Sequence, residues 1–199
     1  MNKSRLSQPD RLHFTGFLVC AALFILGCVA GAIASGALPA DTPMNEFIVS
    51  LARAENLSFG ERFLSALRAT GKFHALVLFF AFSALGIAAI PAVSALRGFL
   101  LCFAITSVVR GFGGAFVPYA LLMFVPEALF AVPGLFLLST HSLVLSTNLL
   151  RACLPRSGSP SAPFCGVFIR RILLCAALVC ATALVNATVA PWLVAHFPR

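Results

Sequence analysis

Glu127 is the one acidic residue within a long apolar stretch of this sequence. A carboxylate in a hydrocarbon environment is costly, so such a residue normally pairs with a cation or helps to move a proton or ion. Arg97 is the candidate partner: if a turn centres near Phe112, Arg97 lies fifteen residues before it and Glu127 fifteen after it. We predict a helix-to-helix ion pair at similar depth near the inner membrane surface. A proton or ion pathway is the alternative, and it would need several further polar residues along its route.

A second group of reactive side chains surrounds His141 in "STHSLVLST". None of its serines lies in a GxSxG context, which a serine nucleophile of that class requires. We therefore expect its hydroxyl groups to bond back to carbonyls of their own helix. These are Ser139, Thr140, Ser142, Ser146 and Thr147.

Recognisable catalytic and metal-binding motifs are missing from the sequence. It contains no HExxH, no paired aspartates in an apolar run, and no CxxC with a second cysteine or histidine pair. The sequence predicts a protein that is not an enzyme and that has no cofactor and no metal site. Five cysteines fall in apolar runs, where a thiol acts as a small hydrophobe. Cys153 and Cys165 fall in a loop expected to be cytoplasmic, where a structural disulfide is not expected.

The elements that must position these residues are membrane helices. The chain has 199 residues, of which 60% are hydrophobic and 10% charged, with a mean hydropathy of +1.01. Soluble domains carry about a quarter charged residues. The net charge of +8 does not indicate nucleic-acid binding, because the basic residues border apolar runs instead of forming a soluble basic domain.

The N-terminal third predicts one span and one outer loop. After a cytoplasmic tail, residues 1–13, the apolar run 14–34 is long enough to cross the bilayer, since 21 helical residues rise about 31 Å. A signal peptide cleaved near "AIA" is the alternative. Gly27, Gly31 and Ser35 form a small-xxx-small row that could pack on another helix.

Residues 35–72 carry balanced charges and are expected outside the cytoplasm. Ser58 and Glu61 have capping-box spacing and predict an amphipathic helix over 58–70. Two roles remain open for it: a connector on the membrane surface, or a docking face for an extracytoplasmic partner.

The remaining chain predicts four more crossings within a single membrane domain, residues 1–199. Span 2 covers 73–96, with His74 at its outer edge, and span 3 with its turn covers 98–114. Residues 115–150 form a span broken by proline and glycine, continued by a segment that is either the rest of the broken helix or packed on the inner surface. The basic loop 151–171 is cytoplasmic, and span 5 covers 172–192 with Trp192 as an interfacial anchor. The expected fold is an all-α integral membrane protein with its N-terminus inside and its C-terminus outside.

The central segment from Arg97 to Pro126 resembles stage II sporulation protein M, a membrane protein family of endospore engulfment. That family has a basic residue followed by G-F-x-x-G-F, a G-x-G turn, and a proline before a polar pair. This chain departs from the pattern at Cys102, which replaces a glycine, and at Glu127-Ala128, which replace the polar amide pair. The matching positions are Arg97, Gly98, Phe99, Phe103, Gly111, Gly113 and Pro126.

The resemblance implies a scaffold of the cell membrane without activity of its own. Its implied partners are the stage II sporulation proteins D and P, which degrade peptidoglycan, and its implied location is the septal membrane of the mother cell. A homo-oligomer of this chain is a further possibility. Arg110 has no counterpart in the family pattern, and we expect it to reach the outer surface by snorkelling. The competing hypothesis is a small permease or transporter component, because helices broken by proline and glycine also line substrate sites.

Overall fold

The computed structural model describes residues 8–37, 57–112, 117, 124–152 and 166–195. Within these ranges, five helices are long and apolar enough to cross a membrane. The predicted all-α, multi-pass membrane fold with five spans is confirmed at this level. The helical elements are α1 (Gln8–Ala37), α3 (Phe59–Ala81), α4 (Gly86–Phe112), the π-helical η2 (Glu127–Ala131), α6 (Val132–Ala152) and α7 (Gly166–Ala195).

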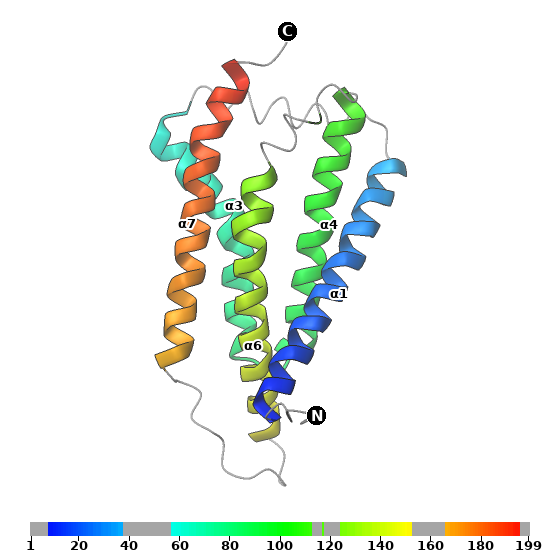
Figure 1. Cartoon of the computed structure of the whole chain (residues 1–199), viewed down its shortest axis with the longest axis vertical. Helices are drawn as coiled ribbons and strands as arrows, with labels where there is room; N and C mark the ends of the chain where they lie inside the picture. The colour runs from blue at the N-terminus through cyan, green and yellow to red at the C-terminus, as the bar shows by residue number, and fades with distance from the viewer. Residues whose placement is uncertain (1–7, 38–56, 113–116, 118–123, 153–165, 196–199) are drawn as a thin grey trace, which may run out of the picture.

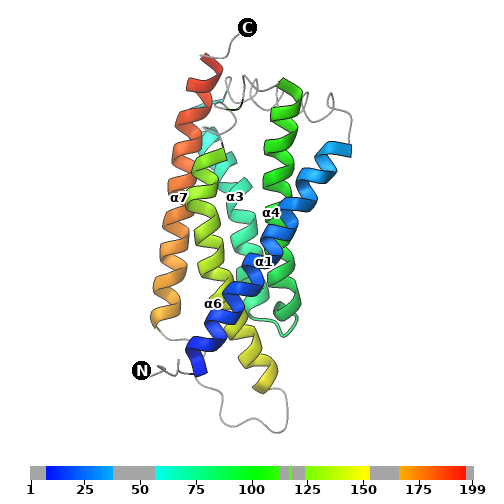
Figure 2. The ribbon, with the colours of Figure 1, turned by 45° about the vertical axis from the view of Figure 1, so that its right-hand side comes forward.

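The helices alternate in direction along the chain, so α1, α4 and α7 run upward in Figure 1 and α3 and α6 run downward. Helix α6 occupies the middle of the bundle, where it contacts α1, α3, α4 and α7. Helix α1 crosses the bundle obliquely in both ribbon views (Figures 1 and 2). The central position of α6 means that Glu127, in the π-helical turn that leads into it, faces the interior instead of the lipid.

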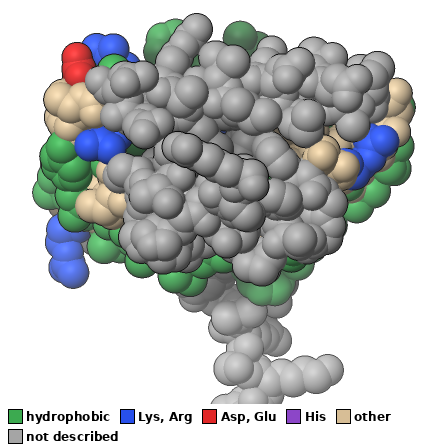
Figure 3. Space-filling model, turned by 90° about the horizontal axis from the view of Figure 1, so that it is seen from above, with side chains coloured by type: hydrophobic (Ala, Val, Ile, Leu, Met, Phe, Trp, Pro, Cys, Tyr) green, Lys and Arg blue, Asp and Glu red, His purple; other side chains and the backbone are tan. Residues whose placement is uncertain are grey.

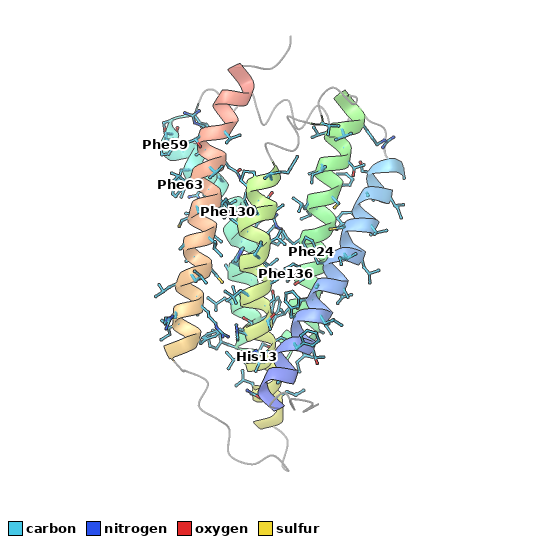
Figure 4. The ribbon with its side chains drawn as sticks, viewed as in Figure 1. His13, Phe24, Phe59, Phe63, Phe130 and Phe136 are labelled. Carbon is cyan, nitrogen blue, oxygen red and sulfur yellow. The ribbon has the colours of Figure 1, made fainter. Side chains whose placement is uncertain are left out.

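All five long helices contribute to one apolar core. Phe136 of α6 lies between two rings of α1, with centroids 5.8 Å from Phe17 and 5.2 Å from Phe24, and Figure 4 shows Phe24 and Phe136 facing each other. The outer faces remain apolar: seen from above, hydrophobic side chains form much of the described rim (Figure 3). In a bilayer this rim faces lipid. The buried core members are Cys20, Phe73, Val77, Ile90, Val93, Leu135, Leu138 and Cys175.

The closest helix pair is α1 with α4, and small residues make that approach possible. A Cβ atom added at Gly27 would lie 2.0 Å from the carbonyl oxygen of Ala95, and one at Gly31 would lie 2.2 Å from that of Phe99. Further along the same row, the hydroxyls of Ser35 and Ser107 are 2.9 Å apart. The prediction that Gly27, Gly31 and Ser35 pack on another helix is confirmed.

The boundary between the second and third helices differs from the predicted one. The capping box at Ser58 and Glu61 is present, but the helix it starts does not end near residue 70; it continues as α3 to Ala81. The chain then turns through residues 82–85, and α4 begins at Gly86, inside the run predicted as span 2. A Cβ at Gly86 would lie 2.2 Å from the carbonyl oxygen of Phe80, so glycine permits this tight turn.

Two physical reasons explain why the predicted boundary between the second and third helices is wrong. The charged residues of the upper part of α3, such as Glu61 and Arg68, lie on its exposed face, where long side chains can reach water while the helix continues. The turn at residues 82–85 is apolar in sequence, so hydropathy does not separate it from its neighbours. Arg97 and His74 therefore both lie deeper than predicted.

The described part of the fourth span, residues 124–152, is helical without interruption. The expected break by proline and glycine is not seen in these residues; they contain instead a π-helical turn, η2, in which the amide of Val132 donates to the carbonyl of Glu127. Pro133 has no amide hydrogen, so the ordinary helical pattern cannot be completed at this point. The segment that follows is α6 itself, in the bundle, and not a separate piece on the inner surface.

The last helix begins earlier than predicted. Arg170 and Arg171, expected in a loop, belong to α7, which starts at Gly166. The motif position Gly113, the basic loop over 153–165 and most of the outer loop, residues 38–56, lie outside the described residues.

Candidate functional site

Arg97 and Glu127 form an ion pair inside the bundle, as the sequence predicted. Arg97 is 8% exposed, and the pair joins α4 to the π-helical turn before α6. Its predicted depth is wrong: Arg97 lies about 16 Å from the start of α4 and about 22 Å from its end, counting 1.5 Å per residue. Arg97 therefore lies in the middle part of α4 and not at the end of a span, whereas Glu127 lies three residues after Phe124, where the described part of the fourth span begins.

The Arg97 guanidinium has a second contact, with the ring of Phe73 on α3. The distance from the guanidinium carbon to the ring centroid is 4.7 Å, within the range of cation–π attraction. An arginine in a low-dielectric interior needs such compensation, because its charge loses the hydration that water would give. Helices α3 and α4 and the π-helical turn η2 thus meet at Arg97.

His74 lies beside this pair, buried at 9% exposure. Its Nδ1 is 3.3 Å from the carbonyl oxygen of Thr70, one turn earlier in α3. A Cβ at Gly134 of α6 would lie 3.5 Å from Nε2 of His74. This nitrogen has no hydrogen bond of good geometry to any described residue. His74 is therefore a polar group of the bundle interior, and the prediction of an interfacial position is wrong.

The sequence does contain a pattern that places His74 on a buried helix face. The expected start of a span at residue 73 concealed this pattern. The buried positions of α3 are Thr70, Phe73, His74, Val77 and Ala81, which repeat at helical spacing. Extending the amphipathic pattern of residues 58–70 beyond residue 72 would have placed Phe73 and His74 on the buried face.

The π-helical turn positions Glu127. The buried Pro126 precedes it, and Glu127 is the first residue of η2. A π-helical turn changes the direction in which successive side chains point and often occurs where a helix carries a functional group. Here it brings the carboxylate of Glu127 to the side of Arg97.

The other positions of the central motif serve packing. A Cβ at Gly98 would lie 2.2 Å from the carbonyl oxygen of Phe24 on α1, so only glycine fits there without a backbone shift. Phe99 and Phe103 stack with centroids 5.9 Å apart along α4. Gly111 lies in the last turn of α4. The structure thus brings Arg97, Pro126 and Glu127 together, while Gly98 and Phe99 face the α1 interface.

Arg110, which we expect to snorkel, makes a contact that the sequence did not predict. It is exposed, and its guanidinium donates to the carbonyl of Ser35 near the end of α1. The last carbonyls of a helix have no partner within the helix, so this contact caps α1 from the neighbouring helix.

The hydroxyl groups around His141 partly follow the prediction. Thr140 donates to the carbonyl of Phe136 at 2.8 Å and Thr147 to that of Val144 at 2.8 Å, both within α6. Ser146 instead donates across the bundle to the carbonyl of Ser83, at 2.6 Å. Ser139 and Ser142 are fully buried and have no hydrogen-bond partner in the described part of the chain.

Chemically, the Arg97 site holds one fixed charge pair and one histidine nitrogen inside a packed bundle. Among the residues that the structure describes, no three side chains of His, Cys, Asp or Glu are grouped to hold a metal ion. No protein-family model, curated protein or solved structure matches this chain. The resemblance of residues 97–126 to stage II sporulation protein M therefore remains a prediction.

Proposed function

We propose that this chain is a non-enzymatic membrane scaffold: a five-helix bundle that holds partner proteins in the bilayer. The observation that supports this role most directly is that polar groups in the interior join one helix to another. Arg97 pairs with Glu127, Ser35 with Ser107, and Ser146 with the Ser83 carbonyl. Such contacts fix the relative positions of α1, α4 and α6, which a rigid platform requires.

We further propose that the N-terminal end of α1 faces the cytoplasm. The start of α1, the end of α6 and the start of α7 lie at the same end of the bundle (Figure 1). The chain segments that begin, join and enter these helices carry Lys3, Arg5, Arg11, Arg151, Arg156, Arg170 and Arg171. Loops rich in lysine and arginine stay on the cytoplasmic side of membranes.

The setting of endospore engulfment rests on the resemblance of residues 97–126. It assigns the stage II sporulation proteins D and P as partners and the septal membrane of the mother cell as the location. A scaffold without a catalytic set would position these peptidoglycan-degrading enzymes so that the mother-cell membrane can move around the forespore.

Copurification tests the sporulation role. The tagged full-length chain, extracted from sporulating cells in mild detergent, is expected to retain one or both enzymes, and a deletion strain is expected to stop before engulfment is complete. A cytoplasmic-membrane protein of unrelated function, with the same tag, controls for carry-over in detergent. Absence of both enzymes together with normal engulfment would contradict this role.

A permease or transporter component is the second candidate, supported by the Arg97–Glu127 pair and the buried His74 beside it. Buried ionisable groups in membrane helices often mark ion or proton routes. Proteoliposome uptake that is lost in Glu127→Gln but kept in Glu61→Gln, an exposed carboxylate of α3, would favour transport over the scaffold.

A further inference from the structure

The lower end of the bundle contains a hollow of about 390 Å³ between α6 and α7. Leu137 of α6 and Leu174 of α7 form its apolar part, and Arg170 and Arg171 form its basic part. Leu174 and its neighbour Leu173 are 52% and 63% exposed, so the apolar wall continues into the lipid-facing surface of α7. The hollow therefore joins two cations to the hydrocarbon region.

Arg171, one of the two arginines of the hollow, bonds to a histidine that packs against a second histidine. The Arg171 guanidinium donates to Nδ1 of His141 on α6. The His141 ring in turn packs against the ring of His13 on α1, with centroids 4.6 Å apart. Figure 4 shows His13 at the lower end of α1, beside α6. Since a guanidinium has five N–H donors, the bond to His141 fixes the group and leaves donors for a ligand.

Acidic residues are scarce at this end. The sequence has no Asp or Glu from residue 128 to the C-terminus, and Asp10 is the one acidic residue of the N-terminal 40. Glu127 lies at the opposite end of the fourth span, joined to Arg97. The positive charge of Arg170 and Arg171 is therefore not neutralised by an acid of α6 or α7.

We propose that this hollow binds the headgroup of an anionic membrane phospholipid. Arginine pairs with phosphate through two parallel N–H bonds, which gives Arg170 and Arg171 a fitting ligand. The leucine wall provides a path for an acyl chain, so a membrane lipid fits better than free phosphate. Basic pockets between helices at the cytoplasmic side are a known type of site for acidic lipids.

Lipid binding to the full-length protein tests this proposal. The purified chain is placed in nanodiscs of phosphatidylcholine with or without phosphatidylglycerol, and in detergent with each lipid or with inorganic phosphate. Phosphatidylglycerol is expected to bind and to raise the thermal unfolding temperature, and phosphate alone is expected to do neither. Because a basic residue near an anionic surface contributes about 1 kcal/mol, each substitution Arg170→Gln or Arg171→Gln should weaken binding about fivefold.

The matched control is Arg68→Gln, which removes an exposed arginine of α3 that does not line the hollow. It should keep the preference for phosphatidylglycerol. If Arg171→Gln fails to fold, Leu174→Trp provides a second variant, because it fills the hollow while both arginines remain. Equal binding of both lipids, full binding by phosphate alone, or unchanged lipid preference in Leu174→Trp and Arg170→Gln would each overturn the proposal.

Discussion

Arg97 and Glu127 illustrate how a single pair of residues can constrain a membrane bundle. Each charge alone would be costly at this depth, and the two are compensated by each other and by the ring of Phe73. The energetic effect is asymmetric, because removing one partner leaves the other charge buried and unpaired. Removing both partners leaves only a loss of packing.

This asymmetry gives a prediction at the residue scale. Arg97→Ala and Glu127→Ala should each lower the free energy of unfolding in detergent by about 3–5 kcal/mol, and the double variant should be no worse than the more harmful single one. The measurement is a double-mutant cycle of denaturation, with the exposed Arg68→Ala as control. Additive losses in the double variant would show that the two residues are not coupled.

At the scale of elements, the contact between α1 and α4 depends on backbone approach. Gly27, Gly31 and Gly98 lie where a side chain would meet a carbonyl group of the other helix. Backbone atoms cannot move aside as a flexible side chain can. The two helices thus pack at a distance that only glycine permits, and the Ser35–Ser107 contact and the Arg110 cap extend the interface to the end of α1.

A matched pair of substitutions tests this interface. Gly27→Ala should destabilise the protein by about 1–3 kcal/mol, as overpacking typically does. Gly36→Ala, also in α1, places its Cβ in open space, so helix propensity should make it neutral or stabilising by up to about 1 kcal/mol. Opposite signs in thermal denaturation are expected. Equal effects of the two substitutions would argue against close packing of α1 on α4.

At the scale of the whole molecule, five helices of alternating direction put the start of α1 and the end of α7 at opposite ends of the bundle (Figure 2). The start of α7, with Arg170 and Arg171, lies at the same end as the start of α1, and the upper end includes the capped start of α3 (Figure 1). In the orientation that we propose, partners that act on the cell wall would meet the upper end, whereas acidic lipid headgroups on the cytoplasmic side would meet Arg170 and Arg171.

Topology reporters test this arrangement. Alkaline phosphatase fused after Arg199 should be active, and the same enzyme inserted after Gly158 in the basic loop should be inactive, because it folds only outside the cytoplasm. A green fluorescent protein at the same two positions serves as the reciprocal control. Activity in the reverse pattern would show that the chain is inverted, and activity at both positions would contradict the single span between residue 158 and the C-terminus.

The sequence by itself determined the membrane class, the number of spans, the capping box at Ser58, the small-residue row of α1 and the partner of Glu127. These follow from local composition and spacing, or from the rule that a charge in hydrocarbon requires an opposite charge. Only the tertiary structure decided the depth of Arg97, the burial of His74, the turn at residues 82–85 and the meeting of Arg171 with His141 and His13. Hydropathy cannot separate an apolar turn from an apolar helix, and a helix with charges on one face resembles a loop until its neighbours are known. Which residues meet across the bundle depends on helix packing, which the order of residues along the chain does not show.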